Sequence, residues 1–109
     1  MRVLFDQGTP VPLRKHLTAH EVVTTFDLGW GRLGNGELLN HAENAGFEVL
    51  VTTDQNLKYQ QNLTGRRIGV VVITTTSWPR IQKVVAAVVE AVNSVAKYAS
   101  MMRWNFLPA

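Results

Sequence analysis

The chain alternates short apolar segments with segments whose apolar residues recur at helical spacing. Strands are predicted where apolar or β-branched runs end at polar, glycine or proline clusters, at residues 2–5, 20–26, 47–53 and 67–75. The last run contains Val70-Val71-Val72-Ile73, and a continuous apolar run of this kind is typical of a strand covered on both faces. We therefore expect an α/β fold with a mainly parallel central sheet.

Helices are predicted between and after these strands, at about residues 12–17, 35–45, 54–61 and 78–99. Asn35 and Asp54 are expected to be N-caps, and Gly46 is expected to take a left-handed conformation after the second helix. The fourth helix is rich in valine, which has low helix propensity, so it requires packing against the sheet. The apolar tail at residues 100–109 is expected to dock on the domain or on a second copy.

Composition predicts one folded domain over residues 1–109, because 46% of the residues are hydrophobic and only 17% are charged. No apolar run reaches the roughly 18 residues that a membrane-spanning helix needs, and the amino terminus does not resemble a signal peptide. The absence of cysteine excludes disulfides and thiolate metal sites. We expect a cytoplasmic protein without membrane contact.

The net charge of +3 lies partly in short basic clusters. Such clusters are typical either of phosphate binding or of an ordinary solvated surface.

Three acidic residues lie at the boundaries of predicted elements. Asp6 follows the first strand, Glu37 lies in the first turn of a helix, and Asp54 follows a later strand. Ligands of open α/β sheets bind in the crevice at the carboxyl ends of the strands, and oxygen ligands gathered there suit Mg²⁺ or Mn²⁺. Each acid also has a purely structural interpretation, because Asp6 suits a turn, Glu37 suits the positive end of a helix and Asp54 suits an N-cap.

The residues around these acids form three blocks. In order and spacing the blocks resemble the short PIN-like proteins related to VapC-type toxins, over about residues 1–75: Leu4-Phe5-Asp6-Gln7, Gly34-Asn35-Gly36-Glu37-Leu38-Leu39 and Val51-Thr52-Thr53-Asp54-Gln55-Asn56. The resemblance implies a PIN-like three-layer α/β/α sandwich that binds one or two divalent ions and cleaves RNA. It also implies a cognate antitoxin protein and a homodimer.

The resemblance assigns catalysis and metal binding to Asp6, Glu37 and Asp54, with Asn56 as a further metal-binding residue. Asp6 and Asp54 would bind the ion directly, whereas Glu37 would bind it through water or orient the attacking water. A cation that bridges phosphate and water lowers the barrier to hydrolysis and makes hydroxide available near neutral pH. Amides reduce the negative charge at three positions where relatives often carry acids: Gln7, Asn35 and Asn56.

Further side chains are candidates for contact with RNA or for orienting the acids. Basic side chains pair with phosphate and tyrosine stacks on bases, so the candidate RNA contacts are Arg14, Lys15, Lys58 and Tyr59. Thr53 would orient the acids through hydrogen bonds. His41 shares a helical face with Glu37, and either lines the cleft or is solvated. Trp30 is either a recognition residue or, as we expect, a cover over the core.

Two functions of different classes stay open on the sequence. The first is a metal-dependent ribonuclease that acts as the toxin of a toxin–antitoxin pair. The second is a degenerate PIN-like module that binds or dimerises without efficient cleavage. A doubly wound phosphoacceptor domain fits less well, because that class expects paired acids at the first strand and a lysine after the last. Here Gln7 follows Asp6, and the final predicted strand runs into Thr74-Thr75-Thr76.

Overall fold

A sheet of five parallel strands forms the centre of the computed structural model, which describes residues 1–57, 61–97 and 104–107. The strands lie in the order β2-β1-β3-β4-β5, with the bounds β1 (Arg2–Phe5), β2 (Glu21–Thr24), β3 (Val49–Thr52), β4 (Gly69–Ile73) and β5 (Trp104–Leu107). Each neighbouring pair is parallel. The predicted α/β fold with a parallel sheet is therefore confirmed.

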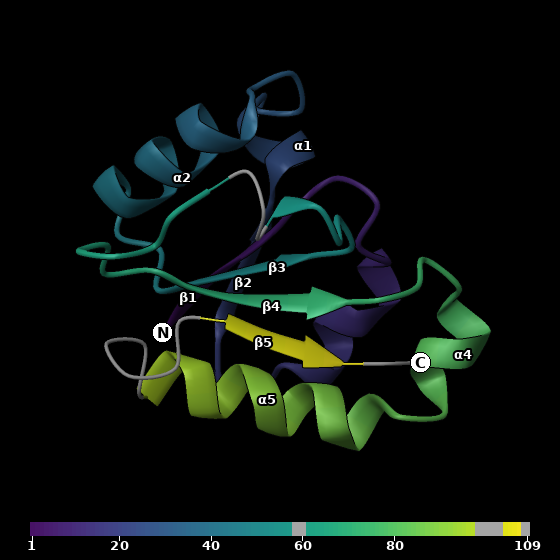
Figure 1. Cartoon of the computed structure of the whole chain (residues 1–109). Helices are drawn as coiled ribbons and strands as arrows, with labels where there is room; N and C mark the ends of the chain where they lie inside the picture. Colours follow the sequence, from purple (N-terminus) through teal and green to yellow (C-terminus); the bar gives the residue numbers. More distant parts are fainter. Residues whose placement is uncertain (58–60, 98–103, 108–109) are drawn as a thin grey trace.

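Helices cover both faces of this sheet (Figure 1). One face packs against α2 (Asn35–Asn44). The other packs against α5 (Val85–Lys97) and the 3-10 helix η1 (Val11–His16). η1 overlaps the helix expected over residues 12–17 and begins one residue earlier. These layers are compatible with a three-layer α/β/α sandwich.

The central strand β3 is buried on both faces, because successive side chains of a strand point to opposite sides of the sheet. Val49 and Val51 pack in the same cluster as Val88 of α5. Leu50 packs on the opposite face with Leu39 of α2. All five side chains are fully buried. The valine-rich helix is thus stabilised by contact with the sheet, as its composition predicts.

The start of α2 differs from the prediction. Gly34, rather than Asn35, is the N-cap, and its carbonyl accepts a hydrogen bond from the Leu38 amide at 2.8 Å. Asn35 is the first helical residue, and its side-chain amide donates to Asp54 instead of capping its own helix. The end of α2 is as expected, because Gly46 has a φ of 83°.

The strand expected over residues 20–26 ends early. β2 stops at Thr24, which caps the single-turn helix α1 (Thr25–Leu28). The Thr24 hydroxyl accepts from the Asp27 amide at 3.0 Å, and the Asp27 carboxylate accepts from the Thr24 amide at 3.3 Å. This reciprocal capping box outweighs the β propensity of Thr25 and Phe26. The prediction was wrong for these two residues.

The single helix expected over residues 78–99 is also wrong. A turn separates α4 (Trp78–Gln82) from α5. At this turn the Val84 amide donates to the Ile81 carbonyl at 2.9 Å, a spacing of three residues that is too tight for an α-helix. Val84 and Val85 are adjacent β-branched residues, which favours the break.

No helix in the described part of the chain is long and apolar enough to cross a membrane.

Part of the carboxyl-terminal tail docks on the domain as β5, although the sequence did not indicate a strand there. β5 pairs in parallel with β4, and both the amide and the hydroxyl of Thr74 donate to the Leu107 carbonyl at 3.1 Å. Of the two expected docking partners, the domain itself and a second copy, the structure shows the domain for residues 104–107. Residues 98–103 and 108–109 lie outside the described part.

We predict that Thr24→Ala lowers the free energy of unfolding by about 1 kcal/mol, because the Asp27 amide loses its cap. Thr24→Ser keeps the hydroxyl and should stay closer to the parent. Urea denaturation of the three proteins measures both differences. Equal destabilisation by alanine and serine would show that the capping bond does not stabilise α1.

Candidate functional site

The first candidate acid, Asp6, directly follows β1 at the point where the strand order reverses. β1 lies between β2 and β3, and ligand crevices of open α/β sheets form at such positions. The Asp6 amide donates to the Val51 carbonyl at 2.8 Å, which continues the pairing of β1 with β3. The sheet therefore holds the Asp6 backbone beside the end of β3.

The Asp6 carboxylate accepts two hydrogen bonds. Its Oδ2 accepts from the Thr52 hydroxyl at 2.8 Å, and its Oδ1 accepts from the Gln7 amide at 2.8 Å. Burial raises the pKa of Asp6 above its ordinary value of 3.8, while these two bonds lower it and the nearby charge of Asp54 raises it further. The net effect is a raised pKa, so Asp6 holds its negative charge less readily than a solvated carboxylate does.

The second candidate acid, Asp54, lies two residues after β3. Its Oδ1 accepts from the Asn56 amide at 2.9 Å, which is the capping contact that the sequence predicts. Its Oδ2 accepts from Asn35 of α2 at 3.4 Å. The backbone amide of Asp54 donates to the Thr52 hydroxyl at 3.1 Å. Residues 58–60 of the helix expected here lie outside the described part of the chain.

Thr52 links the two acids, a role that the sequence analysis did not assign to it. Its hydroxyl donates to Asp6 and accepts from the backbone of Asp54, and its side chain is fully buried. The available signal was a hydroxyl at the end of an otherwise apolar strand. Thr53, which the sequence suggested instead, lies against Gly8 in the loop after β1.

Neither Asp6 nor Asp54 has a cationic partner among the described residues. Ion pairs in that part of the chain involve other acids: Arg2 with Glu21, Arg14 with Asp27, and Arg66 with Glu43. Two neighbouring, partly buried carboxylates thus repel each other without compensation by a described cation. Such a pair suits a divalent cation, since Mg²⁺ is commonly held by one or two carboxylates.

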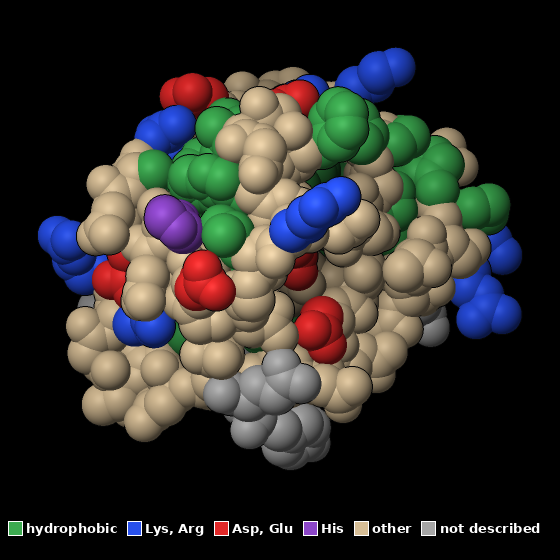
Figure 2. All heavy atoms as spheres, turned by 90° about the horizontal axis from the view of Figure 1, so that it is seen from above, with side chains coloured by type: hydrophobic (Ala, Val, Ile, Leu, Met, Phe, Trp, Pro, Cys, Tyr) green, Lys and Arg blue, Asp and Glu red, His purple; other side chains and the backbone are tan. Residues whose placement is uncertain are grey.

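The third candidate acid, Glu37, is not brought into this pair. It is exposed in the first turn of α2, and its charge does not contribute to the shifted pKa of Asp6. Within residues 1–57, 61–97 and 104–107, no group of three or more histidine or acidic residues could hold a metal ion. Figure 2 shows the acidic side chains of the face over α1 and α2 as separate groups.

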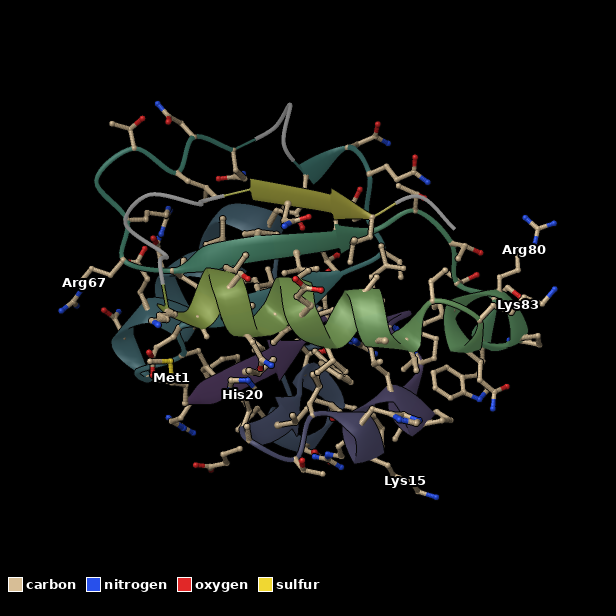
Figure 3. The ribbon with its side chains drawn as sticks, turned by 90° about the horizontal axis from the view of Figure 1, so that it is seen from below. Met1, Lys15, His20, Arg67, Arg80 and Lys83 are labelled. Carbon is tan, nitrogen blue, oxygen red and sulfur yellow. The ribbon has the colours of Figure 1, made fainter. Side chains whose placement is uncertain are left out.

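Of the four candidate RNA contacts, the structure describes Arg14 and Lys15. Arg14 is engaged, because its guanidinium donates to the Val22 carbonyl and pairs with Asp27 at 3.0 Å. Lys15 is exposed on η1 and projects away from the sheet (Figure 3). Lys58 and Tyr59 lie outside the described part of the chain.

The aromatic candidate Trp30 behaves as expected for a cover over the core. Its ring lies 6.2 Å from that of Phe47, a buried core residue, and packs against the cluster beneath α2. His41 is exposed, and its ring lies 5.5 Å from Trp30. His41 therefore packs on Trp30 at the surface.

A cavity of about 640 Å³ lies beside Asp6, at the carboxyl ends of β1 and β2. The loop after β1, the helices η1 and α1, and the glycine-rich loop before α2 form its walls. Asp6 lines this cavity, whereas Glu37 and Asp54 do not. The cavity could not be predicted from the sequence, because it depends on how α1 and η1 pack around the strand ends.

Comparison with known proteins gives no match to a protein-family model, to a curated protein or to a solved structure. The PIN-like assignment therefore stays a prediction that rests on the three sequence blocks.

We predict that Asp54→Asn lowers the pKa of Asp6, because it removes the negative charge that raises it. Thr52→Val should raise the pKa of Asp6 further, since the carboxylate loses a hydrogen-bond donor. A ¹³C NMR titration of the aspartate carboxyl groups without divalent ions measures both changes. Glu37→Gln is the matched control and should leave Asp6 unchanged. An unchanged Asp6 titration in Asp54→Asn would mean that the two carboxylates do not interact.

Proposed function

We propose that this chain is a PIN-like, divalent-metal-dependent endoribonuclease and the toxin of a toxin–antitoxin pair. One observation carries the proposal: two carboxylates without a described cationic partner, Asp6 and Asp54, converge where parallel strands end, and burial and their mutual repulsion raise the pKa of Asp6. The parallel α/β fold with helices on both faces supports the PIN-like assignment. The order of the three sequence blocks supports it independently.

Asp6 and Asp54 are the residues that would hold Mg²⁺ or Mn²⁺. The backbone amide of Asn56 donates to Asp54, and its exposed side chain is a candidate further ligand. When bound, the cation supplies charge neutralisation for the phosphate and a more acidic water. The Thr52 hydroxyl fixes Asp6 Oδ2 and thereby sets the direction of the remaining lone pairs. Glu37 is exposed on α2 outside this pair, so its proposed role in orienting a water molecule rests on the sequence resemblance alone.

The proposed site is weaker in charge than a site with four or five acids. Asn35 donates a hydrogen bond to Asp54 and therefore partly satisfies the carboxylate that would bind the cation. Gln7 and Asn56 are uncharged as well. We therefore expect a cation requirement in the millimolar range rather than tight binding.

The proposed biological setting follows from the resemblance. It comprises an RNA substrate, a cognate antitoxin, a homodimer and a cytoplasmic location. The second candidate function is a PIN-like binding or dimerisation module without efficient cleavage. The separation of Glu37 from the Asp6–Asp54 pair favours this alternative, because catalysis would then depend on two acids rather than three.

We predict that Asp6→Asn and Asp54→Asn each reduce Mn²⁺-dependent cleavage of a labelled RNA pool, on the order of 100-fold or more, because an amide cannot neutralise the cation. Glu90→Gln on α5 makes the same change in charge at an exposed position and should cleave like the parent. Circular dichroism verifies that all variants are folded. Cleavage by either aspartate variant at the parental rate would contradict the proposed site.

We also predict that Mg²⁺ or Mn²⁺ raises the melting temperature of the parent, since the cation relieves repulsion between the two carboxylates. A cation at ten times its dissociation constant adds about 1.4 kcal/mol, or about 6 °C for a chain of this size. The shift should disappear in Asp54→Asn and persist in Glu90→Gln. Equal shifts in all three proteins would place the bound cation elsewhere.

A further inference from the structure

The cavity beside Asp6 has the dimensions of a ligand site. Its volume of about 640 Å³ falls within the range of roughly 300–1,000 Å³ that is usual for small-molecule pockets. Buried Phe5 and partly buried Asp6 both line it, so the candidate acid opens onto the cavity. A molecule in this cavity would lie directly beside Asp6.

An aromatic side chain stands at this cavity in an unusually exposed position. Phe26 of α1 lines the cavity although 90% of its surface is accessible to solvent. Val11 of η1, which is 54% exposed, adds a second apolar group. Phe26 and Val11 thus give the lining of the cavity an exposed apolar part, and exposed apolar patches mark binding surfaces.

The backbone that carries Phe26 is firmly held. Thr24 and Asp27 lie before and after Phe26 in the sequence, and the reciprocal hydrogen bonds between them hold the backbone of this turn. Arg14 then ties Asp27 to the Val22 carbonyl of β2. Hydrogen bonds with Thr24, followed by the contact with Arg14, lower the pKa of Asp27. The exposed ring is therefore carried by a turn whose backbone these hydrogen bonds hold in place.

The cavity also contains one arginine without a partner among the described residues. Arg32 is exposed in the glycine-rich loop and lines the cavity. Arg14, the other arginine of the cavity, is already occupied by Asp27 and Val22. A guanidinium and an exposed aromatic ring in one cavity are the combination that binds a nucleotide, because one group pairs with phosphate and the other stacks on the base. Figure 2 shows hydrophobic and basic side chains next to each other on this face.

We propose that this cavity binds one nucleotide of single-stranded RNA, with its base stacked on Phe26 and its phosphate paired with Arg32. The inference rests on the proposed function and specifies its substrate, since a base must leave a duplex stack before it can enter a concave pocket. The arrangement places the strand against Asp6. Arg32, which has no acidic partner among residues 1–57, 61–97 and 104–107, lines the same cavity as the apolar ring. This charge favours a nucleotide over a second copy of the chain, which would cover the ring with apolar surface.

The test measures the affinity for a fluorescein-labelled, six-nucleotide single-stranded RNA by fluorescence anisotropy in EDTA, so that no cleavage occurs. Phe26→Ala should weaken binding about tenfold, whereas Phe26→Trp should retain it. Arg32→Ala should weaken binding and reduce the slope of log affinity against log salt by about 0.7, whereas Arg32→Lys should retain the slope. Arg80→Ala removes an exposed arginine from α4, away from the cavity (Figure 3), and should bind like the parent.

The outcomes separate this inference from the proposed cleavage. Parental affinity in both Phe26→Ala and Arg32→Ala, or no binding by the parent, would overturn the nucleotide site even if Asp6-dependent cleavage were found. Weakened binding by both variants, with no cleavage by the parent in Mn²⁺, would support the nucleotide site and reject the nuclease. If Phe26→Ala dissociates a dimer in sedimentation without altering RNA affinity, a second copy covers the ring and the inference is wrong.

Discussion

The parallel pairing of β1 with β3 determines where the candidate site residues lie. Phe5 is opposite Val51, and the Asp6 amide continues the ladder by donating to the Val51 carbonyl. A shift of this register by one residue would turn the apolar side chains of β1 toward the wrong layers, so the two core clusters hold it in place. The position of Asp6 beside Thr52 and Asp54 is therefore a consequence of core packing.

The same pairing creates an electrostatic conflict that the described residues do not resolve. Desolvation disfavours the charged form of Asp6, and Asp54 adds repulsion. Protonation of Asp6 therefore stabilises the fold at low pH, and this contribution is lost as the pH rises through its raised pKa. Thr52 offers a hydroxyl but no positive charge. A conflict of this kind at the end of a strand is more typical of a functional site than of a structural one.

Elements that follow from apolar patterns could be predicted from the sequence, whereas elements that depend on a capping pair or on pairing with another strand could not. β4 lies within its predicted range because Val70-Val71-Val72-Ile73 is apolar throughout. α1 was missed because Thr24 and Asp27 cap a helix inside a β-branched segment. β5 was missed because its strand character comes from the free edge of β4.

The residues of the candidate site also differ in whether they could be predicted from the sequence. Asp6 and Asp54 could be identified as candidate site residues because they follow apolar strands. Thr52 could not, because threonine is common in strands. The separation of Glu37 from the pair depends on where α2 begins and how it lies over the sheet. The role of Phe26 was equally hidden, because its exposure arises only once α1 has formed.

The turn after β1 joins the acid pair to the cavity. Gly8 has a φ of 91°, and a Cβ atom there would lie 3.0 Å from the Thr53 hydroxyl, so this turn requires glycine. Thr9 closes the turn by donating its amide to the Asp6 carbonyl, and its hydroxyl donates to the Val51 carbonyl. Both Gly8 and Thr9 also line the cavity. Asp6 and the cavity wall are therefore parts of one turn anchored on β3. A nucleotide bound in the cavity would be aligned with the proposed metal-binding acid by the turn itself, and such fixed alignment lowers the entropic cost of reaction.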